Sequence, residues 1–350
     1  MKKLLVSLLV TATLTMGLVA CGGDKADKKT EGSSVAETET SSVAETETSS
    51  VAETETSSEA ETVVVSVLDA EGNDIDVEFP LNPEKVVVLN WQTMDFLDAV
   101  GLGDRVVGLI KSGSYPEHLK KYIDDENIKN VGGMKDIDME AVMSLEPDVI
   151  FSSDRTRSKY DEFSKIAPTM SAAVAYKKGF MVGYKALAKQ HAQIFGLTNE
   201  VDATIAGYED RIAKIAEFAD GKTALLGIFA GGINTLGNQG RASIVVNEMG
   251  FKNLAGDEDV NHGNISSYEA WLEMNPEYMF ILDKDTAVGT EAVAAKEQME
   301  VNNPVIAETD AFKNGNIVYL EPGAVWYIAD GGITSLDLMI SCIEEGLGIK

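Results

Sequence analysis

The chain has 350 residues, of which 44% are hydrophobic, so it can bury one large core or two smaller ones. A formal net charge of −28 argues against nucleic acid as a partner, because phosphate binding needs a basic face. Two cysteines without a CxxC motif exclude a disulfide framework and a cysteine metal site.

The first residues predict export. "MKKLLVSLLVTATLTMGLVAC" has two lysines, then seventeen uncharged residues that end on small side chains before Cys21. "LVAC" resembles the bacterial lipobox, which implies that Cys21 is lipidated and becomes the mature N-terminus. The alternative is an ordinary signal peptide followed by a chance cysteine. Cys342, in "LDLMISCIEEGL", is then expected to be a small buried hydrophobic residue.

An acidic tether follows Cys21. The octad "SSVAETET" occurs three times over residues 33–56, and a decayed fourth copy begins at Ser57. Residues 22–62 contain eleven acidic residues and three lysines. This segment has too few apolar residues to form a core, and its glutamates repel one another, so we expect a solvated spacer.

Strands and helices alternate from residue 63 onward. "TVVVSVLDAEGNDIDVEFP" predicts a hairpin that turns at Glu71-Gly72-Asn73. "EKVVVLN" predicts a buried parallel strand, and "TMDFLDAVGL" follows at helical spacing. "RVVGLI", "AVMSLEPDVIFSS" and a helix from Lys159 continue the pattern. Such alternation is typical of a parallel sheet with helices on its faces.

The second half repeats this order. "KTALLGIFA" and "EYMFILD" predict strands, as does "GNIVYL", whereas "ASIVVNEMGF", "SYEAWLEMNP" and "ITSLDLMISCIEEGL" predict helices. Between the halves, Val201, Ile205, Tyr208, Ile212, Ile215 and Ala219 form one apolar helical stripe. Gly221 ends this stripe. We therefore predict an α/β fold of two Rossmann-like lobes with parallel-rich sheets, joined by one long helix, with the ligand cleft between the lobes.

The predicted organisation has five segments. They are a signal peptide (1–20), the lipidated cysteine and acidic tether (21–62), an N-terminal α/β lobe (63–198), a linking helix (199–220) and a C-terminal α/β lobe (221–350).

One short unit occurs in both lobes. "IDMEAVMSLEPDVIFSSDR" (137–155) and "SSYEAWLEMNPEYMFILDK" (266–284) align without gaps, and they end on Arg155 and Lys284. Ligands of open parallel sheets bind at the carboxyl ends of the strands, so both cations are expected in one cleft. Arg241, in the glycine-rich loop "AGGINTLGNQGRAS" before a predicted helix, is a third candidate for anion binding.

These features resemble the helical-backbone substrate-binding proteins of ABC importers, which serve iron–siderophores, haem and corrinoids. The nearer resemblance is to the catecholate-siderophore binders, over about residues 63–350. The stretches that carry it are "MEAVMSLEPDVIFSSDRTRSKYDEFSKIAPT", "GRASIVVNEMGFKNL", "NHGNISSYEAWLEMNPEYMFILDK" and "VWYIADGGITSLDLM".

The resemblance implies a basic site for a ferric catecholate. In that family, three basic residues at the positions of Arg155, Arg241 and Lys284 hold the anion, and the third is commonly arginine. Arginine pairs with such anions and stacks on their rings, whereas lysine has the charge but lacks the planar guanidinium group. A solvated surface charge is the alternative for each cation taken alone.

His262 and Tyr327 match a family pair that coordinates iron when the siderophore leaves positions open. Imidazole and phenolate are both suitable ligands for ferric iron. His118 and His191 are expected to be ordinary surface or packing residues. The protein is expected to have no intrinsic cofactor, because the iron arrives with its siderophore.

Three further positions bear on the cleft. Trp91 directly follows the first strand of the N-terminal lobe, where it either lines the cleft or fills a gap between helices. Leu236 stands where an aromatic residue is common in the family, and Gly240 where serine is usual. Either change is expected to widen the pocket.

Glu140 and Glu269 occupy equivalent helix positions in the repeated unit. The resemblance implies that such a pair docks on arginines of the membrane permease, and a two-fold partner suits two symmetric acids. Plain solvation is the alternative. The expected partners are the ABC permease with its ATPase, a ferric siderophore, and the membrane through the lipid, for a monomer outside the cytoplasm.

Other functions are less well supported. The sequence contains no GxSxG, HExxH or Walker A motif and no Rossmann fingerprint in a strand–helix context, which argues against an enzyme. Three scattered histidines do not suit a divalent-metal carrier. Haem is the main alternative within the fold, because His262 or Tyr327 could be an axial ligand, and a corrinoid is the next.

Overall fold

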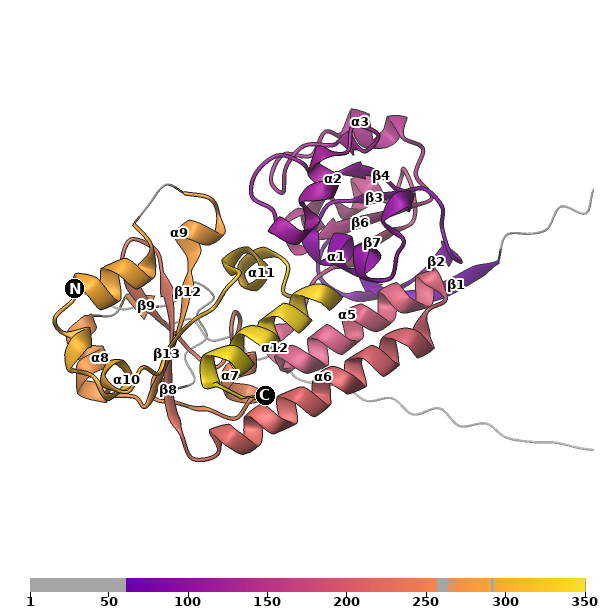
Figure 1. Ribbon diagram of the computed structural model, residues 1–350. Helices are drawn as coiled ribbons and strands as arrows, with labels where there is room; N and C mark the ends of the chain where they lie inside the picture. The colour runs from indigo at the N-terminus through magenta and orange to yellow at the C-terminus, as the bar shows by residue number, and fades with distance from the viewer. Residues whose placement is uncertain (1–60, 257–263, 266, 291–292, 350) are drawn as a thin grey trace, which may run out of the picture. The chain divides into compact units, whose positions relative to one another are not determined.

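The computed structural model describes residues 61–256, 264–265, 267–290 and 293–349, and these belong to one compact unit, Ser58–Lys350 (Figure 1). The predicted signal peptide, Cys21 and almost all of the predicted acidic tether lie outside the described residues. Within the described part of the chain, no helix is both long and apolar enough to cross a membrane.

An antiparallel hairpin and a parallel sheet form the first half of this unit. The hairpin consists of β1 and β2, as predicted. The N-terminal sheet has the strand order β5-β4-β3-β6-β7, and every pairing in it is parallel. The strands are β1 (Thr62–Leu68), β2 (Asp74–Pro80), β3 (Val86–Val88), β4 (Val106–Leu109), β5 (Lys129–Asn130), β6 (Val149–Ser153) and β7 (Thr169–Ala172).

Helices connect the strands of the N-terminal sheet, as the alternating pattern predicted. The α-helices are α1 (Trp91–Ala99), α2 (Lys120–Asp124), α3 (Met139–Ser144), α4 (Tyr160–Phe163) and α5 (Phe180–Phe195). Short 3-10 turns are η1 (Gly103–Arg105), η2 (Glu117–Leu119), η3 (Asp154–Lys159) and η4 (Tyr176–Lys178).

The C-terminal sheet is mixed. Its strand order is β11-β9-β8-β12-β13, with β10 also paired to β8. The strands are β8 (Thr223–Phe229), β9 (Ile233–Leu236), β10 (Lys252–Asn253), β11 (Asn264–Ile265), β12 (Tyr278–Asp283) and β13 (Ile317–Tyr319). The helices are α6 (Thr198–Ala219), α7 (Ile244–Asn247), α8 (Tyr268–Met274), α9 (Lys284–Ala287), α10 (Asp310–Lys313), α11 (Gly323–Ile328) and α12 (Ile333–Leu347), with a π-helical turn η5 (Glu297–Val301) and a 3-10 turn η6 (Ile306–Glu308).

The glycine-rich segment before Arg241 differs from the prediction. It was expected to be a loop, but it contains β9, which pairs antiparallel with β8. Gly231, at φ +69°, allows the chain to reverse, and Ile233 and Leu236 then bury their side chains. Leu236 is thus a core residue of the C-terminal sheet, and the expectation that it widens the pocket is wrong.

The linking helix was predicted closely. It runs as α6 from Thr198 to Ala219, and the six residues of the predicted stripe are its buried residues. α6 packs against α5 and α12. Beside the apolar stripe, Arg211 donates hydrogen bonds to Glu344 and to Asp337, which both lie on α12. The contact between α6 and α12 therefore includes charged groups as well as apolar side chains.

His191 is a core residue of α5, as predicted. Its ring stacks on Phe96 and Phe151 at centroid distances of 4.9 and 5.4 Å. Its Nε2 lies 2.9 Å from the hydroxyl of Thr93, and its Nδ1 lies 2.9 Å from the carbonyl oxygen of Leu187. Burial lowers the pKa of His191 to about 4, so the ring is neutral at physiological pH.

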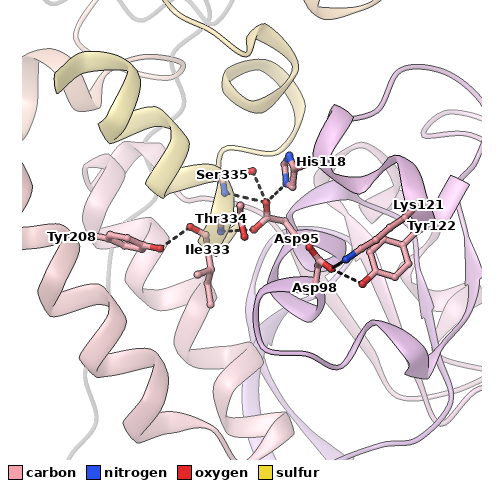
Figure 2. A network of polar contacts seen from close by, with 9 residues as sticks. All are labelled: Asp95, Asp98, His118, Lys121, Tyr122, Tyr208, Ile333, Thr334 and Ser335. Atoms are coloured by element: carbon pink, nitrogen blue, oxygen red, sulfur yellow. Dashed lines mark hydrogen bonds and ion pairs between the residues drawn. The ribbon is translucent and has the colours of Figure 1, made fainter. Parts of the chain in front are cut away.

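A buried carboxylate on α1 caps the first turn of α12 (Figure 2). The two oxygens of Asp95 accept hydrogen bonds from the backbone N–H groups of Thr334 and Ser335, at 2.8 and 3.0 Å. The hydroxyl of Ser335 and the Nε2 of His118 also lie within 2.7 Å of Asp95. Asp95 is fully buried. The free N–H groups of a helix N-terminus favour an anion, so these hydrogen bonds offset the free-energy cost of burying the carboxylate.

Two further contacts hold the start of α12. The hydroxyl of Tyr208, on α6, donates to the carbonyl oxygen of Ile333 at 3.0 Å. Gly332 leaves the room that the Asp95 carboxylate occupies, because a Cβ atom at this position would lie 2.3 Å from Asp95 Cγ. The start of α12 thus contacts both α1 and α6.

We predict that Gly332→Ala lowers the free energy of unfolding by about 1–3 kcal/mol, because the added methyl displaces a buried carboxylate from its donors. Gly207→Ala is the matched control. Gly207 lies within α6 with open space around it, so alanine there is expected to stabilise the protein by about 0.5–1 kcal/mol. Guanidinium denaturation followed by circular dichroism measures both changes. Equal effects of the two substitutions would contradict this account of the Asp95 contact.

Candidate functional site

A cavity of about 850 Å³ is lined by residues from both halves of the unit. Four of the predicted ligand-binding residues lie in its wall: Trp91, Arg155, Arg241 and Tyr327. Gly240 lines it as well. The structure therefore brings together residues that the sequence places up to 236 positions apart, from 91 to 327.

Arg155 follows the strand end that the sequence indicated. β6 ends at Ser153, and the chain continues into the 3-10 turn η3. Ser153 and Thr156 form a reciprocal capping box at this turn. Arg155, one residue before Thr156, is exposed and lines the cavity. The cap thus fixes the backbone from which this cation extends.

Arg241 packs on Tyr327. The guanidinium carbon lies 4.2 Å from the centroid of the Tyr327 ring, and Nε donates to the backbone carbonyl of Tyr327 at 3.4 Å. Tyr327 is 9% exposed and lies on α11. A cation over an aromatic face is attracted by the ring quadrupole, so the pair holds the arginine in a defined orientation.

Trp91 combines the two roles that the sequence left open. It is the first residue of α1, where the side chain of Asn90 caps the helix by accepting from the N–H of Thr93 at 2.7 Å. The indole is only 2% exposed, yet it belongs to the cavity lining. Its ring centroid lies 6.3 Å from that of Tyr115. The Nε1 of Trp91 has no hydrogen-bond partner among the described residues.

Lys284 lies where the repeat predicted, but it is not in the cavity wall. It begins α9 directly after β12, and the side chain of Asp283 caps that helix. Its place in the ligand site stays a prediction. His262, which was predicted to coordinate iron together with Tyr327, lies outside the described residues. In the described part, no three or more His, Cys, Asp or Glu side chains cluster as a metal site.

The two repeated glutamates do occupy matching places. Glu140 is the second residue of α3, which Asp138 caps, and Glu269 is the second residue of α8, which Ser267 caps. Both glutamates are exposed. Their role in docking stays a prediction.

Several charged residues of the cavity were not singled out from the sequence. Arg157, Lys177 and Lys178 add three basic groups to its wall. Asp330 is 4% exposed and accepts hydrogen bonds from the hydroxyl of Tyr176 and from Nε2 of Gln92. Burial raises the pKa of Asp330, and the hydrogen bond from Tyr176 opposes that shift.

Sequence signals differ for these residues. Arg157 lies two positions after the predicted Arg155, so the strand-end signal could have identified it, although it was not predicted. Nothing in the local pattern indicated Tyr176 or Asp330, whose contact joins positions 154 residues apart.

A second cavity, of about 890 Å³, contains none of the predicted residues. It lies between the segment 113–117 and the C-terminal half, where Ser114 donates to the carbonyl oxygen of Val288 at 2.6 Å. Its charged residues are Lys296 and the acids Glu117, Asp283 and Glu321. An anion is therefore better accommodated by the cavity that holds Arg155 and Arg241.

Comparison with known proteins identifies the family of the protein that contains this cavity. A family model described as periplasmic binding protein matches residues 86–324. The chain belongs to the periplasmic binding protein family. It is 35% identical over 287 residues to the petrobactin-binding protein YclQ of Bacillus subtilis, a match that covers 80% of this chain and 86% of that protein. The ferric-anguibactin-binding protein FatB of Vibrio anguillarum is 26% identical, over 75% of this chain and 82% of its own length.

Solved structures show the same fold. The crystal structure of YclQ superposes with a TM-score of 0.74 at 32% identity, covering 83% of this chain and 100% of that one. The catecholate-siderophore binding protein VctP of Vibrio cholerae gives 0.73 at 27% identity, covering 81% and 100%. A more distant relative, at 23% identity, is described as an uncharacterized ABC transporter substrate-binding lipoprotein.

These matches confirm the class predicted from the sequence. The fold is the two-sheet α/β architecture of ABC substrate-binding proteins with a long linking helix. The family is one of binding proteins and not of enzymes.

Proposed function

We propose that this protein is the extracytoplasmic receptor of an ABC importer, and that it captures a ferric catecholate siderophore. The observation that carries the proposal is the cavity that Arg155 and Arg241 line together with the aromatic residues Trp91 and Tyr327. The names of the relatives YclQ, FatB and VctP, which bind petrobactin, ferric anguibactin and catecholate siderophores, support it.

The chemistry of the cavity suits this ligand. A ferric tris-catecholate carries three negative charges on flat rings, and guanidinium groups both pair with anions and stack on such rings. Arg241 already lies on the ring of Tyr327, which holds its guanidinium group in a defined orientation at the cavity wall. Its orientation before binding reduces the entropy that the ligand must offset.

Membership of this family also supports a proposal for how the ligand reaches the permease. We propose that the protein acts as a monomer, that a lipid on Cys21 anchors it outside the membrane, and that the acidic tether spans the distance to the permease. The permease and its ATPase are then the partners to which the ferric siderophore is delivered. Three of the relatives are named lipoproteins, which supports the anchor.

Arg241→Ala is predicted to weaken binding of a ferric tris-catecholate by about 1.5–3 kcal/mol, because a charge-assisted contact is lost. Arg155→Ala is expected to act in the same direction, whereas Arg105→Ala, outside the cavity, leaves affinity unchanged. Titration followed through the charge-transfer absorption of the iron complex measures each affinity. If the unmodified protein binds haemin and not the catecholate, the proposed ligand is wrong.

Tyr327 and His262 are proposed to complete the iron coordination of a tetradentate ligand. Tyr327→Phe and His262→Ala should then lose affinity mainly for a bis-catecholate, which leaves two iron positions open. For a hexadentate siderophore, only lost packing remains, on the order of 1 kcal/mol. Parallel titrations with both ligands at neutral pH give the comparison. Equal losses for both ligands would show that the pair lines the pocket without coordinating iron.

Glu140 and Glu269 are proposed to dock on the permease. The double substitution Glu140→Ala and Glu269→Ala is expected to leave ligand affinity intact and to reduce uptake of the iron-loaded siderophore by cells. Glu162→Ala with Glu217→Ala removes two exposed glutamates at other positions and serves as the control. Fractionation of the same cells checks that the protein stays with the membrane. Normal uptake by the first variant would contradict the docking role.

A further inference from the structure

A buried carboxylate, that of Asp330, belongs to the wall of the ligand cavity. Asp330 lies in the turn between α11 and α12 and is 4% exposed. One of its oxygens accepts a hydrogen bond from the hydroxyl of Tyr176, in η4, and the other accepts from Nε2 of Gln92, on α1. An acid in the wall of an anion site opposes binding for as long as it is ionised.

The backbone that follows Asp330 is tightly packed. A Cβ atom at Gly331 would lie 3.0 Å from Cγ of Gln92. A Cβ atom at Gly332 would lie 2.3 Å from Cγ of Asp95, whose carboxylate caps α12. With its backbone held and both oxygens hydrogen-bonded, Asp330 has little freedom to turn away from an incoming anion. Its response to such a charge is therefore a change of protonation.

The neighbours of Asp330 act on its protonation in opposite directions. Burial raises the pKa of Asp330, which favours the neutral acid. The hydrogen bond from Tyr176, the charge of Arg241 and the hydrogen bond from α1 oppose this shift in pKa and favour the carboxylate. Tyr176 keeps its own proton, because burial and the charge of Asp330 raise the pKa of Tyr176 well above its usual range. Lys177 and Lys178, which follow in η4, are exposed and act on Asp330 through solvent.

Other acids of the cavity wall are exposed. Glu71 lies in the turn of the β1–β2 hairpin, Asp74 begins β2, and Asp154 forms an ion pair within η3. Water and salt screen charges in such positions. Among the described acids of this wall, only Asp330 is buried. The balance of charge that a bound anion meets therefore depends most on Asp330.

We propose that Asp330 is a proton-linked residue of the cavity, which is ionised in the ligand-free protein and takes up a proton from solvent when an anionic iron complex binds. This proposal rests on the function proposed above. An anion close to a buried carboxylate raises the free energy of the ionised form and leaves that of the neutral acid almost unchanged. The neutral acid also has an O–H group, which can donate to an anionic ligand. Proton uptake thus removes the repulsion at the wall.

This linkage gives the affinity a defined dependence on pH. The complex holds the proton more tightly than the free protein does. The affinity therefore rises as the pH falls through the pKa of Asp330 in the complex, and levels off below the pKa of Asp330 in the free protein. Asparagine at this position keeps an acceptor oxygen for Tyr176 but cannot ionise. Asp330→Asn is thus expected to bind a hexadentate ferric tris-catecholate about three- to tenfold more tightly than the unmodified protein at about pH 8, and equally well at about pH 5.

Titrations of both proteins with the same ferric tris-catecholate, from about pH 8 to about pH 5, give the ratio of the two Kd values. Protonation of the ligand itself cancels in this ratio. Asp76→Asn is the control, because it removes one negative charge from an exposed position outside the cavity wall. It is expected to bind like the unmodified protein at every pH. Calorimetry in two buffers with different heats of ionisation measures the proton uptake directly, which is expected to be smaller for Asp330→Asn.

Three results would overturn the inference: a ratio that does not change with pH, weaker binding by Asp330→Asn at every pH, or equal proton uptake by the two proteins. Tyr176→Phe is a second variant that does not depend on the folding of the first. It removes a hydrogen bond that favours the carboxylate, so proton uptake should begin at higher pH, and an unchanged onset contradicts the proposal. Failure of the unmodified protein to bind the tris-catecholate would instead refute the proposed function.

Discussion

The buried carboxylate of Asp95 is the contact on which the rest of the site depends. Removing a carboxylate from water is costly unless several donors replace the solvent, and the first turn of α12 supplies three, with His118 beside them. Trp91 lies four positions before Asp95 on α1, and Asp330 lies four positions before Thr334. The contact therefore fixes two segments that line the cavity: Trp91 lies about one helical turn away along α1, and Asp330 lies in the turn between α11 and α12.

Further contacts support the same junction. Asp330 accepts hydrogen bonds from Tyr176 and Gln92, which belong to the N-terminal half, and Tyr208 of α6 holds the carbonyl oxygen of Ile333. Several elements thus meet where α11 ends and α12 begins. Moving one of these elements would therefore disturb more than one buried hydrogen bond. A binding protein gains from such a junction, because a cavity that is formed before the ligand arrives loses less entropy on binding.

The sequence predicted the parts of the fold that depend on local periodicity. The stripe of α6 was predicted residue for residue, because apolar residues that recur at steps of three and four over this length are typical of an amphipathic helix. β9 was missed because glycines on either side masked a four-residue strand. Asp95 was not singled out, since its partners on α12 lie 239 and 240 positions away and no local pattern indicates a carboxylate that caps a distant helix.

The site shows the same division between local and long-range information. Arg155 could be predicted because the carboxyl ends of parallel strands meet at one edge of a sheet, a rule that needs only the position of each strand. Arg241 was indicated instead by its glycine-rich segment before a predicted helix. The acids of the hairpin turn could not be predicted, because their presence in the wall depends on how Gly72 packs against Arg157. A net charge of −28 says nothing about this balance, since the charge that a ligand meets is that of the wall around it. Local signals therefore indicated the two arginines of the cavity wall, whereas the acids that share this wall depend on contacts between segments far apart in the sequence.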